Sequence, residues 1–117
     1  MPAIKNNKDE KLVELIVSAI GDKKGLDIKV LKLKKSIADY MVLCSAESEP
    51  QIRAISDSIE EKVRKTGIKG YRWEGVIGSG WRVLDLGNFI VHIMGAKERR
   101  YYNLEELWEN RAIIYHY

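Results

Sequence analysis

The stretch Asp85–Met94, DLGNFIVHIM, decides the fold, because it contains two strand-like runs joined at Gly87–Asn88. Together with the preceding run from Trp81, it predicts a β-hairpin, since a two-residue loop of this composition is typical of tight hairpin turns. The stretch also places one aspartate and one histidine, Asp85 and His92, among residues that otherwise indicate a buried strand. These two side chains could be catalytic, could bind a metal, or could mark a strand face that another molecule covers.

The two-residue loop fixes which residues oppose each other, so both faces of the hairpin can be written out. One face is apolar and typical of a core, and it consists of Leu84, Leu86, Phe89, Val91 and Ile93, with Arg82 at its end. The other face, called the mixed face below, consists of Trp81, Val83, Asp85, Ile90, His92 and Met94. On the mixed face, Asp85 and His92 are diagonal neighbours, roughly 7 Å apart at the backbone.

The mixed face allows two interpretations. Protein interfaces concentrate aromatic residues, methionine and a few polar groups, which indicates a docking surface for another polypeptide. Alternatively, a helix of the same chain covers the face, and Asp85 forms a hydrogen bond with His92 or a nearby backbone group. Apolar residues on a strand face are therefore not sufficient to identify a docking surface, because many exposed apolar residues have no binding function. The sequence leaves both interpretations open.

Three helices are predicted around the hairpin. The first covers residues 8–20, where an apolar stripe begins after a capping box at Asn7 and Glu10 and ends at Gly21. The third follows Gly95 and carries apolar side chains at helical spacing. A second capping box, Asn103 with Glu106, would allow this third helix to begin later.

The second helix has the clearest sequence pattern. Ser48 and Gln51 form its capping box, Pro50 falls in its first turn, and Gly67 ends it. Its buried stripe is Ile52, Ile55, Ile59 and Val63.

Three further segments are predicted to be strands. Residues 27–33 partly alternate and carry lysines, which indicates a strand near an edge. Residues 39–46 are almost wholly apolar, which indicates a central strand covered on both faces, and residues 68–75 alternate again. With the hairpin, these segments predict a single α/β domain over residues 1–117, with a mixed sheet of about five strands and flanking helices. Residues 110–117 form a tail whose structure and role the pattern leaves open.

The charge balance argues against a dedicated nucleic-acid-binding protein. The net charge is +3, and the first 69 residues hold that surplus, with 14 Lys and Arg against 11 Asp and Glu. Two lysine clusters, Lys23–Lys24 and Lys32–Lys34–Lys35, could touch phosphate, although solvated lysines are the more common case.

The single cysteine, Cys44, sits in an apolar run and has no partner for an internal disulfide, which suits a buried thiol in a reducing compartment. No apolar run approaches the roughly 20 residues that cross a bilayer. The N-terminal segment lacks the pattern of a signal or transit peptide. We therefore expect a cytoplasmic protein without membrane contact.

The residues offer little for catalysis, metals or cofactors. A hydrolytic triad of Ser45, His92 and Asp85 lacks the G-x-S-x-G turn that presents a nucleophile. Structural zinc needs four ligands, and the chain has one cysteine and two histidines without a cluster. A two-metal transferase site needs a second carboxylate beside Asp85, but the residue two positions along is Gly87. We expect no enzyme activity, no metal and no cofactor.

Four segments in a fixed order resemble the ribosomal silencing factor, or Iojap, family. They are residues 39–68 (DYMVLCSAESEPQIRAISDSIEEKVRKTGI), 72–75 (RWEG), 80–94 (GWRVLDLGNFIVHIM) and 98–108 (ERRYYNLEELW). The resemblance extends from the first predicted helix to about Trp108 and leaves the residues from Asn110 onward unmatched.

The resemblance implies a non-enzymatic protein with a nucleotidyltransferase-like core that lacks the transferase site. Members of the family bind the large ribosomal subunit through one of its proteins, the fourteenth in the usual naming. They block joining of the small subunit when nutrients are scarce. A role in large-subunit maturation and a degenerate nucleotide-binding activity are the alternatives. A homodimer off the ribosome and a peripheral contact to ribosomal RNA are further implications.

Residue by residue, the family's characteristic positions correspond to Trp81, Asp85, Gly87, His92, Tyr101 and Tyr102. The chain departs from the family at Gly87–Asn88, where Gly-Asp is common, and at Ala46–Glu47, where Gly-Thr is common. The first departure removes one negative charge. We expect the mixed face to dock on a basic ribosomal protein, and the expected contact residues are Trp81, Asp85, His92, Met94, Glu74, Glu98, Tyr101 and Tyr102.

Overall fold

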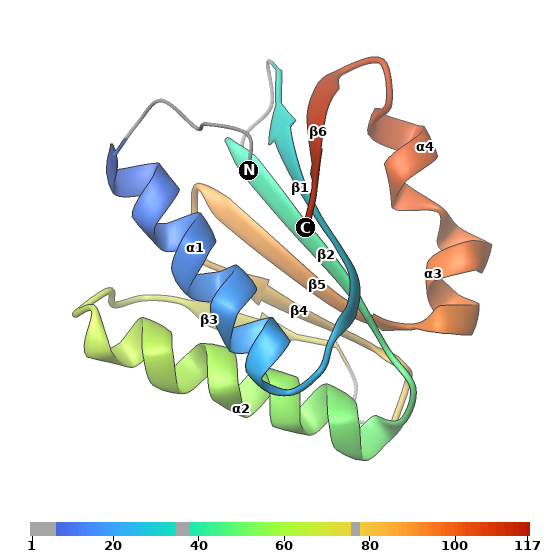
Figure 1. Ribbon diagram of the computed structural model, residues 1–117, viewed down its shortest axis with the longest axis horizontal. Coiled ribbons are helices and arrows are strands. Elements are labelled where there is room, and N and C mark those ends of the chain that lie inside the picture. The colour runs from blue at the N-terminus through green and yellow to red at the C-terminus, as the bar shows by residue number, and fades with distance from the viewer. Residues whose placement is uncertain (1–6, 35–37, 76–77) are drawn as a thin grey trace.

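A computed structural model describes residues 7–34, 38–75 and 78–117. Within them the chain forms one mixed sheet with the strand order β3-β4-β5-β2-β1-β6 (Figure 1). The elements are α1 (Asn7–Asp22), β1 (Leu26–Leu33), β2 (Tyr40–Ala46), α2 (Glu49–Lys65), β3 (Arg72–Glu74), β4 (Trp81–Asp85), β5 (Phe89–Gly95), α3 (Ala96–Tyr102), α4 (Leu104–Trp108) and β6 (Ala112–His116).

The sheet has six strands, where the sequence predicted about five. The additional strand is β6, which the tail forms by pairing antiparallel with β1 at the edge of the sheet. Its pattern was ambiguous because an edge strand packs only partly, and β6 has no fully buried residue. Residues 112–116 are therefore part of the sheet.

The centre of the sheet is the parallel pair β2 and β5, as the apolar run of β2 predicted. All seven residues of β2 are buried, which confirms that both of its faces are covered. The hairpin register is also confirmed, since Trp81 faces Met94 and Val83 faces His92. The hairpin loop closes through the Leu86 N–H, which donates to the Phe89 carbonyl at 2.8 Å.

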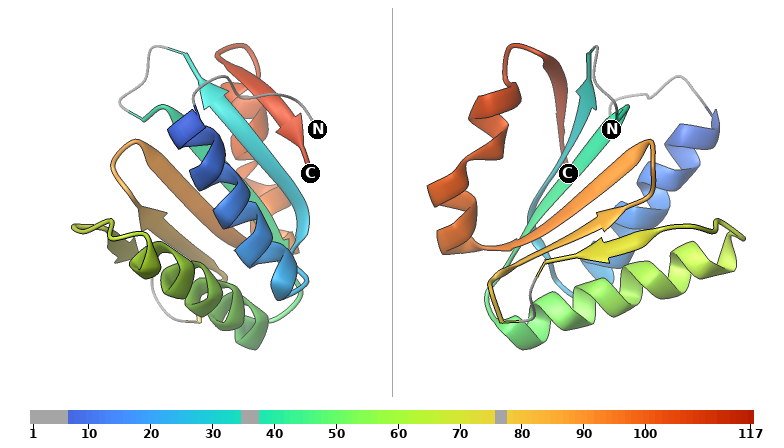
Figure 2. Two further views of the ribbon diagram at one scale, coloured as in Figure 1. Left: turned by 60° about the vertical axis from the view of Figure 1, so that its left-hand side comes forward. Right: turned by 180° about the vertical axis from the view of Figure 1, so that it is seen from behind.

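Helices α1 and α2 cover one face of the sheet (Figures 1 and 2). The predicted cap of α2 is confirmed, because the Ser48 Oγ accepts a hydrogen bond from the Gln51 N–H at 3.2 Å. The helix ends at Lys65, before the predicted stop at Gly67. The core beneath both helices includes the predicted stripe of α2 and the apolar hairpin face, with Ile55, Ile59, Val63, Leu84, Val91 and Ile93 all at 0% exposure.

Two elements differ in length from their predicted ranges. Helix α1 runs on to Asp22, so Gly21 does not end it. Strand β3 has only three residues rather than the predicted 68–75, because a loop with left-handed glycines, Gly67 at φ 85° and Gly70 at φ 79°, precedes it.

The third predicted helix is two short helices, α3 and α4, on the opposite face of the sheet. The break is at Asn103, which takes the left-handed conformation with φ 43°. Leu104 and Trp108 then point inward and pack on a second apolar cluster that includes Met94 and Leu31. The rear view in Figure 2 shows no helix in front of β3 and β4, so α3 and α4 leave that part of the face open.

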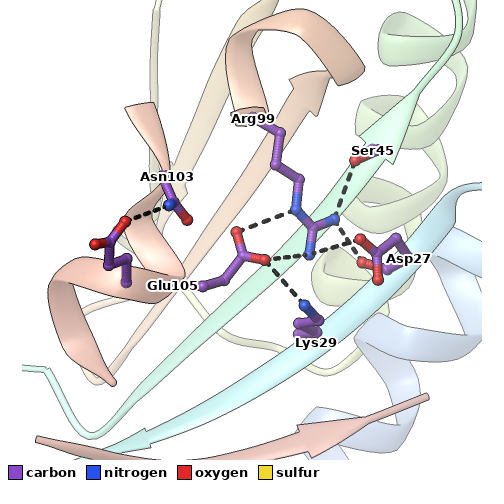
Figure 3. A network of polar contacts seen from close by, with 7 residues as sticks. Asp27, Lys29, Ser45, Arg99, Asn103 and Glu105 are labelled. Atoms are coloured by element: carbon purple, nitrogen blue, oxygen red, sulfur yellow. Dashed lines mark hydrogen bonds and ion pairs between the residues drawn. The ribbon is translucent and has the colours of Figure 1, made fainter. Parts of the chain in front are cut away.

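One buried arginine fastens α3 and α4 to the sheet. The side chain of Arg99 is 6% exposed, and its guanidinium contacts Glu105 from α4, Ser45 from β2 and Asp27 from β1 (Figure 3). Glu105 also accepts a hydrogen bond from the Lys29 ammonium at 3.0 Å. Asp27 lies at an irregularity of β1 with φ 48°, which lets both its carbonyl and its carboxylate meet Arg99.

Because a buried guanidinium is stable only when its donors are paired, the network requires all of its members. We expect Arg99→Met to lower the free energy of unfolding by about 3 kcal/mol, since Glu105 and Ser45 would then face an apolar side chain. Urea denaturation measures this loss. Arg100→Met is the matched control, because Arg100 is next to Arg99 in the sequence but is exposed. This substitution should change the free energy of unfolding by less than about 0.5 kcal/mol. Equal losses in both variants would contradict the assigned role.

The pH dependence of stability provides a second test of the network. Burial alone would raise the pKa of Glu105, but hydrogen bonds and charges from Arg99 and Lys29 hold it below its ordinary value of 4.5. A carboxylate with a lowered pKa in the folded state stabilises above its unfolded pKa and loses this contribution as the pH falls. The stability difference between wild type and Arg99→Met should therefore be largest near neutral pH and shrink in urea titrations below about pH 4.5. A difference that stays constant with pH would argue against the ion pair.

Candidate functional site

One end of the mixed face of the hairpin is covered by this chain, and the other end is partly accessible, so each of the two interpretations applies to one part of the face. Met94 is 0% exposed and His92 is 9% exposed, so this chain covers that end of the face. The expectation that Met94 lies on an exposed surface is therefore wrong, because Leu104 and Trp108 pack on its cluster. At the other end, Val83 and Asp85 are half-buried and belong to β4, which lies in the part of the sheet that α3 and α4 leave open, whereas the half-buried Ile90 of β5 packs on the covered cluster.

Four rings form a continuous ladder from the sheet to the surface. The Trp81 indole N–H donates to the His92 Nδ1 at 3.0 Å, and its ring lies 4.7 Å from that of Tyr102. Tyr102 in turn meets Tyr101 edge-on at 5.0 Å. Exposure rises along the ladder, from 9% for His92 to 52% for Tyr102 and 80% for Tyr101. The buried imidazole thus holds an aromatic cluster that points outward.

The role of His92 in this ladder is support. Burial lowers its pKa from the ordinary 6.5 to about 4, so the ring is neutral at neutral pH. A neutral imidazole can accept a hydrogen bond at one nitrogen, which the contact with Trp81 requires. His92 therefore fixes the position of the indole from below.

The upper rings of the ladder line a surface hollow of about 460 Å³. Its lining residues are Ser79, Trp81, Lys97, Glu98, Tyr101 and Tyr102. The structure thus brings together four of the eight predicted contact residues, although they lie up to 21 positions apart in the sequence. The carboxylate of Glu98 packs against the α-carbons of Gly80 and Gly95, so this predicted contact residue is partly committed within the chain.

The two remaining predicted carboxylates, Asp85 and Glu74, lie at the far end of β4 and on β3. Asp85 accepts a hydrogen bond from the Gly87 N–H at 2.8 Å, so the backbone bond foreseen for it forms in the hairpin loop. Its other oxygen lies 3.5 Å from the guanidinium of Arg72, which is also 3.7 Å from Glu74. This small charged group is open to solvent, with Arg72 72% exposed.

The three residues that the sequence offered for a hydrolytic triad make structural hydrogen bonds to other groups. Ser45 bonds Arg99, His92 bonds Trp81, and Asp85 bonds the hairpin backbone, so these three residues do not form a relay. Burial raises the pKa of the Cys44 thiol to about 12, which keeps it protonated. In residues 7–34, 38–75 and 78–117, no group of three potential metal ligands comes together, and no helix has the length and apolar character to span a bilayer.

Sequence reasoning missed three residues that matter for this surface. Arg99 holds the segment that carries both tyrosines, and Arg72 neutralises Asp85 and Glu74. Arg82 lies over the ring of Trp73 at 4.8 Å on the core side of the hairpin. Arg99 and Arg82 have partners on other elements, and Arg72 pairs with Asp85 on β4 as well as with Glu74 on its own strand, so spacing in the sequence alone does not identify these sets of partners. The pairing of β3 with β4 is the signal that would have placed Arg72 beside Asp85.

Comparison of the chain with known proteins identifies its family. Residues 6–115 match the profile of the family described as ribosomal silencing factor during starvation. The chain is 37% identical to ribosomal silencing factor RsfS of Halalkalibacterium halodurans over 91% of its own length and 92% of that protein. It is 30% identical to the chloroplastic protein Iojap of Zea mays, over 97% of this chain and 51% of that protein.

A solved structure agrees with the fold. The crystal structure of a protein from Chromobacterium violaceum superposes with a TM-score of 0.80 at 30% identity, covering 86% of this chain and 85% of that one. The profile match, the sequence identity and the fold agree over nearly the whole chain. The chain therefore belongs to the ribosomal silencing factor family, RsfS and Iojap.

Proposed function

We propose that this chain is a ribosomal silencing factor that acts without catalysis. It docks on a protein of the large ribosomal subunit and occupies space that the small subunit needs, so that the two subunits do not join. In a bacterial cell this would take place in the cytoplasm. The observation that carries the proposal is the aromatic ladder that leads from the half-buried Trp81 to the exposed Tyr102 and Tyr101, and that the buried His92 fixes from below.

Rigid aromatic side chains are the usual anchors of protein interfaces, because they bury a large area at a small entropic cost. Here the anchor lies beside a hollow of about 460 Å³ that can accept a partner's side chain. The open strip, which consists of β3 and β4, adds apolar contact from the half-buried Val83. A surface of this kind can reach the roughly 800 Å² per partner that specific complexes bury.

The carboxylates at the far end of the strip suit a basic ribosomal protein. Asp85 and Glu74 share the exposed Arg72, at 3.5 and 3.7 Å, and such solvent-exposed pairs contribute little to stability. An incoming cation of the partner can therefore replace Arg72 at small cost. Charge complementarity of this kind favours fast and selective association.

The first test concerns the aromatic anchor. We expect Trp81→Ala to weaken co-sedimentation with large subunits by about 30-fold or more, corresponding to about 2 kcal/mol at an interface hot spot. Tyr101→Ala should weaken it by about tenfold and leave thermal unfolding unchanged, because Tyr101 is 80% exposed. Leu107→Ala is the control, since this side chain is 60% exposed on α4 outside the hollow. Wild-type co-sedimentation by Trp81→Ala and Tyr101→Ala would reject this surface.

The second test concerns the charge of Asp85. Asp85→Asn keeps an acceptor for the Gly87 N–H but removes the charge, so it should weaken large-subunit binding by about fivefold without unfolding the hairpin. Asp85→Arg should abolish binding. Asp57→Arg makes the same charge reversal at an exposed position in the middle of α2, which covers the other face of the sheet, and should leave binding intact. If Asp85→Arg and Asp57→Arg behave alike, the acidic contact is not at Asp85.

A further inference from the structure

We propose that the loop between α2 and β3 binds the phosphate backbone of RNA. This inference rests on the proposed function, because the large ribosomal subunit would supply the RNA beside the docked protein. The loop and its flanks are residues 62–72, KVRKTGIKGYR. Five of these eleven residues are Lys or Arg and none is acidic, whereas the whole chain has a net charge of only +3.

Two of the five cations are available for an external anion. Lys62 pairs with Asp22 at 2.8 Å, Lys65 with Glu61 at 3.2 Å, and Arg72 with Asp85 and Glu74. Arg64 and Lys69 are both exposed and make no ion pair with any residue that the structure describes. Both line a single hollow of about 500 Å³, together with Gly67, Ile68, Gly70 and Tyr71.

The loop backbone adds donors of its own. Among the described parts of the chain, the N–H groups of Lys69, Gly70 and Tyr71 find no hydrogen-bond acceptor. Gly70 has φ 79° and open space around its α-carbon, so a large anion can approach the backbone closely. Successive free N–H groups next to a left-handed residue form concave sites that suit phosphate oxygens.

An aromatic side chain completes the hollow. Tyr71 is half-buried, so its ring is held in place while one part stays accessible. Surfaces that follow RNA without reading its sequence combine cations with aromatic rings on which a base or ribose can stack. Within the described residues, two cations without an ion pair, three N–H groups without an acceptor and one ring match that combination, and none of the residues lining the hollow is a carboxylate that would repel phosphate.

The position of the loop also fits the proposed docking of a ribosomal protein on the aromatic ladder and the open strip, which together form the docking surface. Arg72, which begins β3 directly after the loop, contacts Asp85 of the docking surface. The loop lies at the end of α2 beyond the β3 edge of the sheet (Figure 2). A ribosomal protein seated on the open strip would therefore bring its neighbouring RNA to the loop. Lys23 and Lys24, which the sequence offered for phosphate contact, lie at the opposite end of α2, where the Gln51 side chain bonds their carbonyls.

The test compares two charge-matched double variants on intact, purified large subunits. We expect R64E/K69E to weaken co-sedimentation about tenfold at moderate salt and to reduce the slope of log affinity against log salt by about 1.5, at roughly 0.7–0.9 per phosphate contact. K23E/K24E makes the same change in net charge and should alter neither quantity. R64K/K69R keeps both charges and should bind as wild type does.

A second measurement identifies the chemical class of the partner. Ultraviolet cross-linking of the bound complex, followed by mass spectrometry, should attach RNA nucleotides to the peptide that contains Tyr71. Normal thermal unfolding of R64E/K69E confirms that the exposed substitutions leave the fold intact.

The outcomes separate this inference from the proposed function. If wild type does not co-sediment with large subunits, the proposed function fails. If wild type binds while R64E/K69E and K23E/K24E weaken binding equally, general electrostatics explains the effect and the loop is not the contact. Cross-links of the loop to protein alone would also overturn the inference.

Discussion

The buried contact between Arg99 and Glu105 decides which part of the sheet remains open. Arg99 from α3 and Glu105 from α4 meet across the break at Asn103, and Asp27 and Ser45 join them from β1 and β2 (Figure 3). A guanidinium at this depth must keep its partners, so the two short helices have one stable position over β1, β2 and the end of β5. The consequence is an asymmetric face, which is covered over β1 and β2 and accessible at β3 and β4.

That asymmetry gives the carboxylate and the imidazole of the hairpin separate structural roles. At the sealed end, His92 is neutral and positions Trp81, and at the open end Asp85 closes the hairpin turn while its other oxygen faces Arg72. His92 thus holds the aromatic cluster in place, and Asp85 places a charge at the opposite end of β4. Preorganisation of this kind would lower the entropic cost of the binding proposed for this chain of 117 residues.

The two proposed contacts lie at different ends of the open region and use different physics. The aromatic ladder and its hollow, at the start of β4, suit a folded protein surface, because they offer area and shape. The loop after α2 offers cations, N–H groups without an acceptor among the described residues, and an aromatic ring, which suit a phosphate backbone. Using both would let a small factor recognise a place where a protein and RNA meet, and each weak contact would raise the effective concentration of the other.

The sequence by itself determined the local elements whose causes are local. Ser48 and Gln51 specified the start of α2, Gly87–Asn88 fixed the hairpin register, and the apolar run of β2 marked the centre of the sheet. It also carried enough of the family's pattern to identify the family. Only the tertiary structure decided that the tail is a sixth strand and that Met94 is buried. It also decided that Arg72 pairs with Asp85 and that Arg99 fastens α3 and α4 to the sheet. These features depend on pairings between segments far apart in the chain, and neither periodicity nor capping carries information about such pairings.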